Sequence, residues 1–424
     1  MNDNTEKIGL YLNIKIRTKS SDHEFDYQNL QDIKNIVTFI DESIYLVLTK
    51  DNDIIKIYQH YEVESIKKGE QILFGIQKDE DNSFIFVNPM PGINIEPNKN
   101  NVELLNESLW YVLKSEPINA SYDANDDYYL NENDIIKLGE IKYIIKKINI
   151  RQNKENSIIP NQKISKYDIQ GINKKVEQIF NFYPLITEYK ECSYYNGIKA
   201  KLCKCNKFYE INCIKQWIKN NIRHKERNGN KNFSLEEIRS EKCNAPFPLR
   251  FKLTNDKEID LIGIDIPNSK DTDYIILESF FRDIDSIFYK SIHVIKIANE
   301  DITIGRKNNN IIFEEDQSLS RNHAVIKKEN DKLILRNKGR AGTLILIKDS
   351  FKINENKIHL QIGKVFIEAC IMKKRDFDNI KDNKIIIKNK KDYYEDKKKE
   401  EINNNAEIND NDNSSNRDNF YPSD

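Results

Sequence analysis

Two groups of residues in this chain have types and spacings that could do chemistry. The first group combines arginine, serine, histidine and glycine at the boundaries of apolar runs, as Gly305-Arg306, Ser320-Arg321-Asn322-His323 and Gly342-Thr343. A planar guanidinium, a hydroxyl and free backbone N–H groups are the donors that a phosphate dianion prefers. Gly305 lets the backbone turn tightly before Arg306. The residues therefore allow two interpretations: a guanidinium and a hydroxyl on neighbouring loops that bind an anion, or ordinary solvated loop residues. A neutral imidazole at His323 could tie neighbouring loops together with hydrogen bonds.

The second group is a cluster of cysteines in the middle of the chain. Five of the six cysteines fall between Cys192 and Cys243. Thiolates at close spacing bind Zn²⁺ in tetrahedral sites, and a reducing compartment favours thiols or metal ligands over disulfides. The candidate ligands for one zinc ion are Cys203, Cys205, Cys213 and Cys243. Plain buried thiols are the alternative interpretation.

The elements that must position these residues are mostly β-strands. Residues 8–150 contain short strand-like runs such as IGLYLNIKI and SIYLVLTK, and residues 275–373 show the same pattern. Many short strands at regular spacing predict a β-sandwich or barrel. The fold class that we predict is therefore mainly β, with a sandwich in each of these two regions.

A smaller α+β module is predicted between the two β regions, over residues 170–252. It holds the cysteine cluster and the helix INCIKQWIKNNI, whose apolar residues recur at helical spacing at Ile211, Ile214, Trp217, Ile218 and Ile222. Residues 151–168 are polar and aperiodic and predict a linker. Residues 374–424 are rich in Lys, Asp and Asn and predict a disordered tail.

An internal similarity links the ends of the two β regions. Residues 129–148 read YLNENDIIKLGEIKYIIKKI and residues 352–371 read KINENKIHLQIGKVFIEACI. Both have Asn-Glu-Asn, a glycine after an apolar run, and then an apolar strand. Chance similarity is the rival explanation in a chain rich in Asn and Ile. We interpret the match as two sandwiches of related design that flank the cysteine module.

Composition excludes several classes of function. The net charge is −1, from 67 basic and 68 acidic residues, so nothing draws the whole chain to nucleic acid or to an anionic membrane. The N-terminus lacks the pattern of a signal peptide, and no apolar run reaches the length of a membrane helix. We expect an intracellular protein, in the cytoplasm or nucleus. No glycine-rich nucleotide loop or Ser-His-Asp arrangement is present, so no catalytic residue is predicted.

The Gly-Arg, Ser-x-x-His and Gly-Thr pattern resembles the forkhead-associated (FHA) domain over roughly residues 290–372. The resemblance implies an eleven-stranded sandwich that binds phosphothreonine peptides, with Arg306 and Ser320 holding the phosphate and Arg321 supporting that contact. It also implies structural roles for Gly305, His323, Gly342 and Thr343. Ala341 stands where the family has an Asn that holds the peptide backbone, and Arg340 before it offers a second guanidinium. The N-terminal sandwich lacks the motif, and we expect it to be FHA-like without binding phosphate.

Residues 172–252 resemble a RING-CH zinc finger. The matching residues are Cys203, Cys205, Cys213, Gln216-Trp217-Ile218 and Cys243-Asn-Ala-Pro-Phe-Pro. Ser240 replaces one family cysteine, Glu210 stands at the histidine position, and the opening cysteine pair is missing. The resemblance implies a degenerate finger in which Cys203, Cys205 and Cys243 hold one zinc, and Cys192 or Cys213 completes the set.

The order of the parts resembles multidomain proteins of ciliates and related protists that join a RING-CH finger to an FHA domain. The leading prediction is a non-enzymatic adaptor that binds a phosphothreonine-containing protein. One alternative is a RING-CH-type ubiquitin ligase that is recruited to phosphorylated substrates and works with a ubiquitin-conjugating enzyme. The other is a phosphate-independent scaffold.

Overall fold

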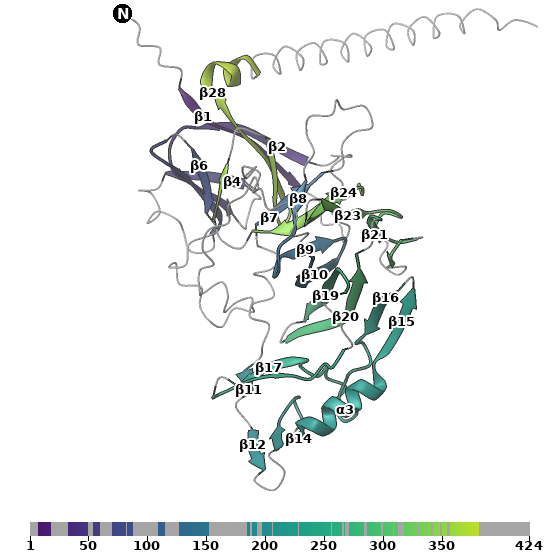
Figure 1. Ribbon diagram of the computed structural model, residues 1–424. Helices are drawn as coiled ribbons and strands as arrows, with labels where there is room; N and C mark the ends of the chain where they lie inside the picture. The colour runs from purple at the N-terminus through teal and green to yellow at the C-terminus, as the bar shows by residue number, and fades with distance from the viewer. Residues whose placement is uncertain are drawn as a thin grey trace, which may run out of the picture.

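A computed structural model describes the chain over the following residues, and every structural statement below refers to them: 7–17, 33–49, 54–59, 70–81, 83–87, 109–114, 127–151, 185–186, 189–192, 197–205, 207–227, 229–255, 257–264, 267, 271–283, 286–297, 300–307, 309–312, 318–329, 331–340, 342–347, 350–353 and 357–380. The chain is mainly β, as predicted, and its strands are drawn in Figure 1. None of the helices in this part of the chain is long and apolar enough to cross a membrane.

The strands form one long sheet and two five-stranded sheets, besides two small sheets in the module. The N-terminal region supplies β1 (Ile8–Arg17), β2 (Ile33–Ile40), β3 (Ile44–Thr49), β4 (Ile54–Gln59), β5 (Glu70–Lys78), β6 (Phe84–Val87), β7 (Trp110–Leu113), β8 (Tyr128–Tyr129), β9 (Ile135–Leu138) and β10 (Ile141–Asn149). The C-terminal region supplies β19 (Tyr274–Asp283), β20 (Ser286–Lys296), β21 (Ile302–Gly305), β22 (Ile311–Ile312), β23 (Ala324–Glu329), β24 (Lys332–Asn337), β25 (Thr343–Leu346), β26 (Ser350–Ile353), β27 (Ile358–Ile362) and β28 (Val365–Lys373). The module supplies β15 (Arg223–Arg227) and β16 (Asn230–Ser234), and the long sheet runs β15-β16-β20-β19-β10-β9-β25-β7-β27-β28-β1-β2.

The two β regions exchange their last three strands. Strands β8, β9 and β10 pair with β24, β25 and β19 of the C-terminal region. In return, β26, β27 and β28 pair with β6, β7 and β1 of the N-terminal region. We call 127–151 and 350–373 the exchanged segments. These are the two segments with similar sequences. Residues 127–151 lie in the C-half, at the place that 350–373 would take without the exchange, and residues 350–373 lie in the N-half, at the place that 127–151 would take.

The exchange divides the strands into two halves of matching design. The N-half joins the sheet β26-β6-β5-β3-β4 to strands β2, β1, β28, β27 and β7 of the long sheet, and the C-half joins β22-β21-β23-β24-β8 to β20, β19, β10, β9 and β25. Buried side chains from the long sheet and both five-stranded sheets form one continuous apolar core. Strand pairing therefore joins the predicted domains 8–150 and 275–373 to each other. The N-half needs strands from 275–373, and the C-half needs strands from 8–150.

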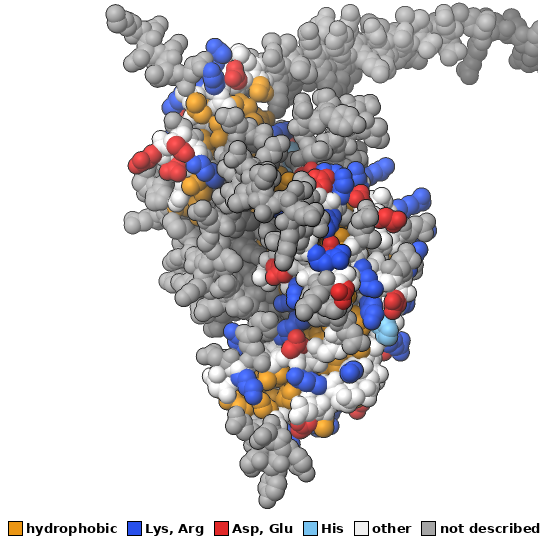
Figure 2. All heavy atoms as spheres, in the orientation of Figure 1, with side chains coloured by type: hydrophobic (Ala, Val, Ile, Leu, Met, Phe, Trp, Pro, Cys, Tyr) orange, Lys and Arg blue, Asp and Glu red, His pale blue; other side chains and the backbone are white. Residues whose placement is uncertain are grey.

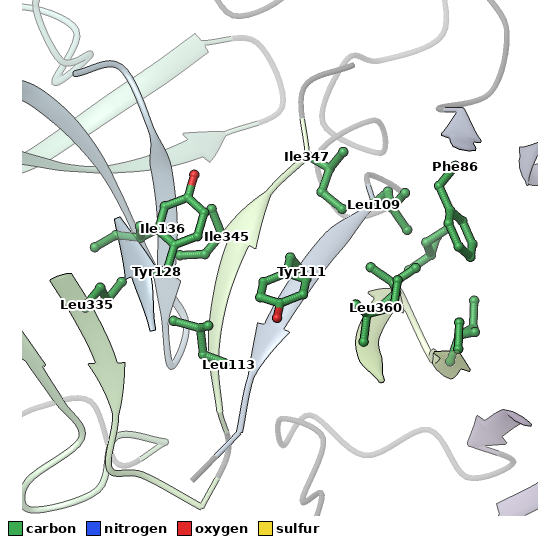
Figure 3. Close-up of a cluster of buried hydrophobic side chains, with 14 of the residues drawn as sticks. Phe86, Leu109, Tyr111, Leu113, Tyr128, Ile136, Leu335, Ile345, Ile347 and Leu360 are labelled. Carbon is green, nitrogen blue, oxygen red and sulfur yellow. The ribbon is translucent and has the colours of Figure 1, made fainter. Parts of the chain in front are cut away.

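The two halves meet at the antiparallel pair β7 and β25 in the long sheet. Ile345 lies opposite Tyr111, and Leu346 lies opposite Trp110. Figure 3 shows Tyr111 and Ile345 on adjacent strands, with Ile136 of the exchanged segment beside Ile345. Because side chains alternate along a strand, β7 and β25 present one face to the core and the opposite face to the module.

Ion pairs fix the exchanged segment 127–151 to the C-half. Arg336 on β24 makes a two-bond pair with Asp127, with N–O distances of 2.5 and 2.6 Å. Asp273 accepts hydrogen bonds from Arg151, at the end of one exchanged segment, and from Lys328 on β23, each at 2.8 Å. Burial raises the pKa of Asp273, but these donors outweigh it and lower the pKa to about 2.

The module packs on the opposite face of the long sheet. Its elements are the sheet of β11 (Leu185–Ile186), β17 (Arg250–Leu253) and β18 (Glu258–Asp260), the sheet of β12 (Tyr189–Cys192), β13 (Gly197–Ala200) and β14 (Tyr209–Glu210), and the helix α3 (Ile211–Asn221). A second apolar cluster joins these elements to side chains of β7, β25, β19 and β20. Arg250 clamps the buried Glu278 of β19 with two N–O contacts of 2.5 and 2.6 Å.

Helix α3 lies where the sequence pattern predicted it. Ile211, Ile214 and Ile218 are buried, and Trp217 and Ile222 pack against the same cluster. Glu210 caps the helix by accepting bonds from the backbone N–H groups of the first turn.

Two stretches differ from the sequence-based expectation. Residues 223–234, inside the predicted module, form the hairpin β15–β16, which extends the long sheet through β20. Residues 374–380, assigned to the predicted tail, form a helix whose buried Phe377 packs its ring against Phe39, with centroids 5.4 Å apart. Residues 381–424 and the linker after residue 151 lie outside the described residues.

The face seen in Figure 2 has basic and acidic side chains interspersed, in keeping with the balanced net charge. Hydrophobic side chains gather on this face at the lower end, around β11 and β17 of the module. Because charges of both signs are mixed on this face, the candidate binding residues of the C-half are those of its loops.

Candidate functional site

Three loops of the C-half come together at one end of the sheet β22-β21-β23-β24-β8. The first follows β21 and carries Arg306, and the second, residues 318–323, precedes β23. The Arg306 backbone N–H donates to the Ser320 carbonyl at 3.1 Å, and the Lys307 N–H donates to the Arg321 carbonyl at 3.3 Å. The third loop, residues 338–342, precedes β25. Its Arg340 N–H donates to the Ser320 hydroxyl oxygen at 3.3 Å.

His323 holds the second and third loops together from the interior. Its side chain is fully buried, its Nδ1 accepts a bond from the Ser320 N–H at 3.2 Å, and its Nε2 donates to the Gly342 carbonyl at 3.0 Å. The bond to Nδ1 assigns the proton to Nε2, so the ring is neutral. A Cβ on Gly339 would lie 2.6 Å from His323 Nδ1, so only glycine fits beside the imidazole.

Gly305 and Gly342 meet backbone requirements that other residues would not. A Cβ on Gly305 would lie 2.3 Å from the Arg321 carbonyl oxygen, which is closer than any real contact. Gly342 has a φ of 75°, in the left-handed region that glycine tolerates. Thr343 follows with a fully buried side chain, and its hydroxyl donates to Asn337 Oδ1 at 3.0 Å.

Two buried asparagines that the sequence reasoning missed brace these loops. Asn309 donates to the carbonyls of Lys307 and Arg321, both at 2.6 Å. Asn337 donates to the Gly339 carbonyl at 2.8 Å and accepts from the Gly339 N–H at 3.2 Å. Asparagine is common in this chain, so its presence beside a loop gave little signal. Only the burial of these two side chains reveals the role.

The arrangement leaves the predicted phosphate-binding groups available at the loop ends. Arg306 is half-buried, and its Nε is a buried donor without a hydrogen-bond partner among the described residues. A buried donor of this kind is costly unless something accepts from it. Ser320 is half-buried beside it, whereas Arg321 and Arg340 are exposed. Ala341, in place of the family asparagine, lies outside the described residues.

One exchanged segment contributes directly to the second loop. The Glu140 N–H, in the turn between β9 and β10, donates to the Ser318 hydroxyl oxygen at 3.1 Å. The loop that carries Ser320 is therefore supported by a turn from the N-terminal region of the sequence. No pattern in the sequence pointed to Ser318 or to this turn.

In the module, the structure brings three of the four predicted metal ligands together. The Sγ atoms of Cys203, Cys205 and Cys243 all lie within 4.8 Å of one another, and those of Cys203 and Cys205 are 2.7 Å apart. The buried Ser240, which replaces a family cysteine, accepts from the Cys243 N–H at 3.4 Å. Its hydroxyl lies 3.1 Å from the Tyr209 hydroxyl.

The thiols of this group have different acidities. Hydrogen bonds from Cys203 and Tyr209 lower the pKa of Cys205 to about 6. A hydrogen bond from Ser240 lowers the pKa of Cys243, while burial raises that of Cys203. Cys213 is outside the group: its thiol is exposed at the start of α3, and Glu210 raises its pKa. The side chain of Cys192 is not described.

Comparison with known families places an FHA domain at residues 302–367. The match confirms the resemblance that was based on Arg306, Ser320 and His323, and it runs from β21 into β28. It therefore includes most of the exchanged segment 350–373, which completes the N-half. No curated protein and no solved structure matched the chain. The resemblance of the module to a RING-CH finger stays a prediction.

Proposed function

We propose that this protein is a non-enzymatic adaptor that binds phosphothreonine-containing proteins through the loops of its FHA domain. FHA domains bind phosphorylated protein partners, which supports the general role. The observation that carries the proposal is the buried, unpartnered Arg306 Nε beside the Ser320 loop. Arg306 and Ser320 hold the phosphate, and Arg321 supports it. His323, Gly305, Gly342 and Thr343 keep the loops in place. Each half acts as an FHA-type sandwich, and only the C-half carries the motif.

The test is a titration of the full chain with matched threonine and phosphothreonine peptides from a peptide library. We expect only phosphorylated peptides to bind, and Arg306→Ala to weaken binding about 10- to 100-fold because it removes a charge-assisted hydrogen-bond donor. Arg306→Lys keeps the charge but loses the fork, so it should restore little. Arg375→Ala, a cation on the helix 374–380, is the matched control and should bind normally.

Equal binding of phosphorylated and unphosphorylated peptides, with no effect of Arg306→Ala, would favour the phosphate-independent scaffold instead. We also place the protein inside the cell, in the cytoplasm or nucleus, where phosphothreonine partners occur.

We further propose that the module binds one zinc ion through Cys203, Cys205 and Cys243. Three converging thiols, two of them with lowered pKa values, fit this ion. Thiolate sulfurs are preferred ligands of Zn²⁺, so these three residues would hold it. The zinc would stiffen the module, and no reaction step depends on it.

Metal analysis of the purified chain tests the zinc proposal and the ligase alternative together. We expect one zinc per chain, lost in Cys205→Ser and retained in Cys213→Ser, since Cys213 lies outside the group. Absence of zinc would contradict the zinc proposal and favour the interpretation of these cysteines as plain thiols. Two zinc ions, with autoubiquitination in the presence of a ubiquitin-conjugating enzyme, would favour the RING-CH ubiquitin ligase.

A further inference from the structure

The phosphate-binding loops carry more positive charge than one phosphate can neutralise. Five basic residues lie on these three loops: Arg306, Lys307, Arg321, Lys338 and Arg340. No ion pair joins any of them to an acidic residue within the described part of the chain. A phosphorylated side chain carries about −1.5 to −2 charges at pH 7, so the five cations of the described loops exceed it by roughly three. Glu314, Glu315 and Asp316, which come shortly before residue 318 in the sequence, lie outside the described residues.

Backbone hydrogen bonds concentrate these cations around residues 320–323. The N–H groups of Arg306 and Lys307 donate to the carbonyls of Ser320 and Arg321. The Lys338 N–H donates to the His323 carbonyl at 2.7 Å, and the Arg340 N–H donates to the Ser320 hydroxyl. The backbones of these four residues therefore belong to one bonded set of loops, which keeps the points of attachment of their side chains close together. Like charges held together in this way favour an anionic ligand.

The positions of the cations divide the site into two parts. Arg306 is half-buried at the first loop, whereas Lys338 and Arg340 are exposed on the third loop. Ala341, which follows Arg340, has no side-chain group to hold a peptide backbone.

We propose that this site selects segments with clustered phosphates: a phosphothreonine bound at Arg306 and Ser320, and a second phosphate nearby bound by Lys338 and Arg340. The inference rests on the proposed phosphothreonine binding and adds to it the class of ligand. Recognition depends on charge and is therefore sensitive to ionic strength, because exposed charges are screened over about 10 Å at 0.1 M salt.

The experiment compares four peptides of one sequence against the full chain by fluorescence anisotropy: unphosphorylated, singly phosphorylated, doubly phosphorylated, and singly phosphorylated with two aspartates at the second position. We expect the doubly phosphorylated peptide to bind about tenfold more tightly than the singly phosphorylated one at 0.1 M salt. The ratio of the affinities for the doubly and the singly phosphorylated peptide should shrink at 0.5 M salt. The aspartate peptide should bind more weakly than the doubly phosphorylated one. Equal affinity of these two peptides would overturn the assignment of a phosphate to the second position.

The paired variant Lys338→Ala/Arg340→Ala locates the second phosphate. It keeps every backbone N–H, so the loop bonds persist, and we expect the ratio of the two affinities to fall close to one. Lys364→Ala/Arg375→Ala removes two exposed cations outside these loops and should leave the ratio unchanged. Thermal melting of both variants checks that they fold.

The outcomes separate the two proposals. If no peptide binds in a phosphate-dependent way, the proposed function fails. If the singly phosphorylated peptide binds and needs Arg306, but a second phosphate adds nothing, this inference alone is overturned. It is also overturned if a polyglutamate peptide competes as well as the doubly phosphorylated one, since that would indicate unspecific attraction.

Discussion

The exchange of strands predicts that the C-terminal region cannot reach its native stability alone. A fragment of residues 271–380 contains the whole stretch that matches the FHA domain, yet strands β26–β28 of this fragment close the N-half in the full chain. The strands that close the C-half come from residues 127–151, which the fragment lacks.

The size of the loss follows from the side chains that the missing segment buries. Ile136, Leu138, Tyr143 and Ile145 are each at most 1% exposed in the core. Burying a large apolar side chain contributes about 1.5–3 kcal/mol, so the four together contribute about 6–12 kcal/mol. That range is about equal to the whole stability of a typical domain. The fragment should therefore be unfolded or loosely packed, and should bind no phosphothreonine peptide.

A rewired chain supplies the control. Residues 271–347, followed by a glycine-serine linker and residues 127–151, contain every C-half strand without any exchange. We expect this chain to melt cooperatively by circular dichroism and to bind phosphothreonine peptides. If fragment 271–380 melts and binds like the full chain, the reasoning is refuted, because β26–β28 would then be able to close their own half.

Three further predictions concern stability and the binding loops. Burial lowers the pKa of His293 to about 3, so the unfolded chain takes up a proton near pH 6.5 and the native chain does not. His293 alone should therefore make stability fall by about 1.4 kcal/mol per pH unit below pH 6.5. Burial also lowers the pKa of His359 to about 3, so the full chain should lose stability about twice as steeply. Urea unfolding at pH 7, 6 and 5 should show this fall, and His293→Gln should about halve its slope. Arg250→Ala leaves Glu278 buried without its partner, and we expect a loss of about 3–5 kcal/mol in urea unfolding; a loss below 1 kcal/mol would contradict the clamp. Ser318→Ala removes the acceptor for the Glu140 N–H, and should weaken phosphopeptide binding about 2- to 10-fold with little change in melting temperature. Unchanged affinity would show that the loop does not depend on the exchanged segment.

The sequence predicted local elements well because their patterns are local. The spacing of Ile211, Ile214 and Ile218 depends only on the helix itself, and alternation along β3 or β23 depends only on which face is buried. The Gly305-Arg306 and Ser320-to-His323 spacings gave the loop site for the same reason. Each of these residues meets a requirement set within a few positions of itself.

The strand exchange could not be predicted from the sequence, because the exchanged and the unexchanged arrangement both fit the same alternation of apolar and polar residues. Residues 129–148 and 352–371 have matching turns and strands, so either segment fits either half by alternation alone. What decides between them is the central pair β7 and β25 and ion pairs such as Arg336 with Asp127, which join positions far apart in the chain. The thiol group was largely predictable: the resemblance to a zinc finger already grouped Cys243 with Cys203 and Cys205, whereas only the fold shows that Cys213 lies outside the group.

The pairing of β1 with β28 sets the order in which the protein can mature on the ribosome. Leu10 lies opposite Ile371, so β1, the first of these strands to be synthesised, cannot form this pairing until β28 has been synthesised. At 5–20 residues per second, that interval is about 20–70 s. Throughout it, the apolar strand β1 lacks the neighbour that covers one of its edges. The N-half is therefore the last part of the protein to close, although its sequence is translated first, and one edge of β1 is open to incorrect pairing until β28 has been made.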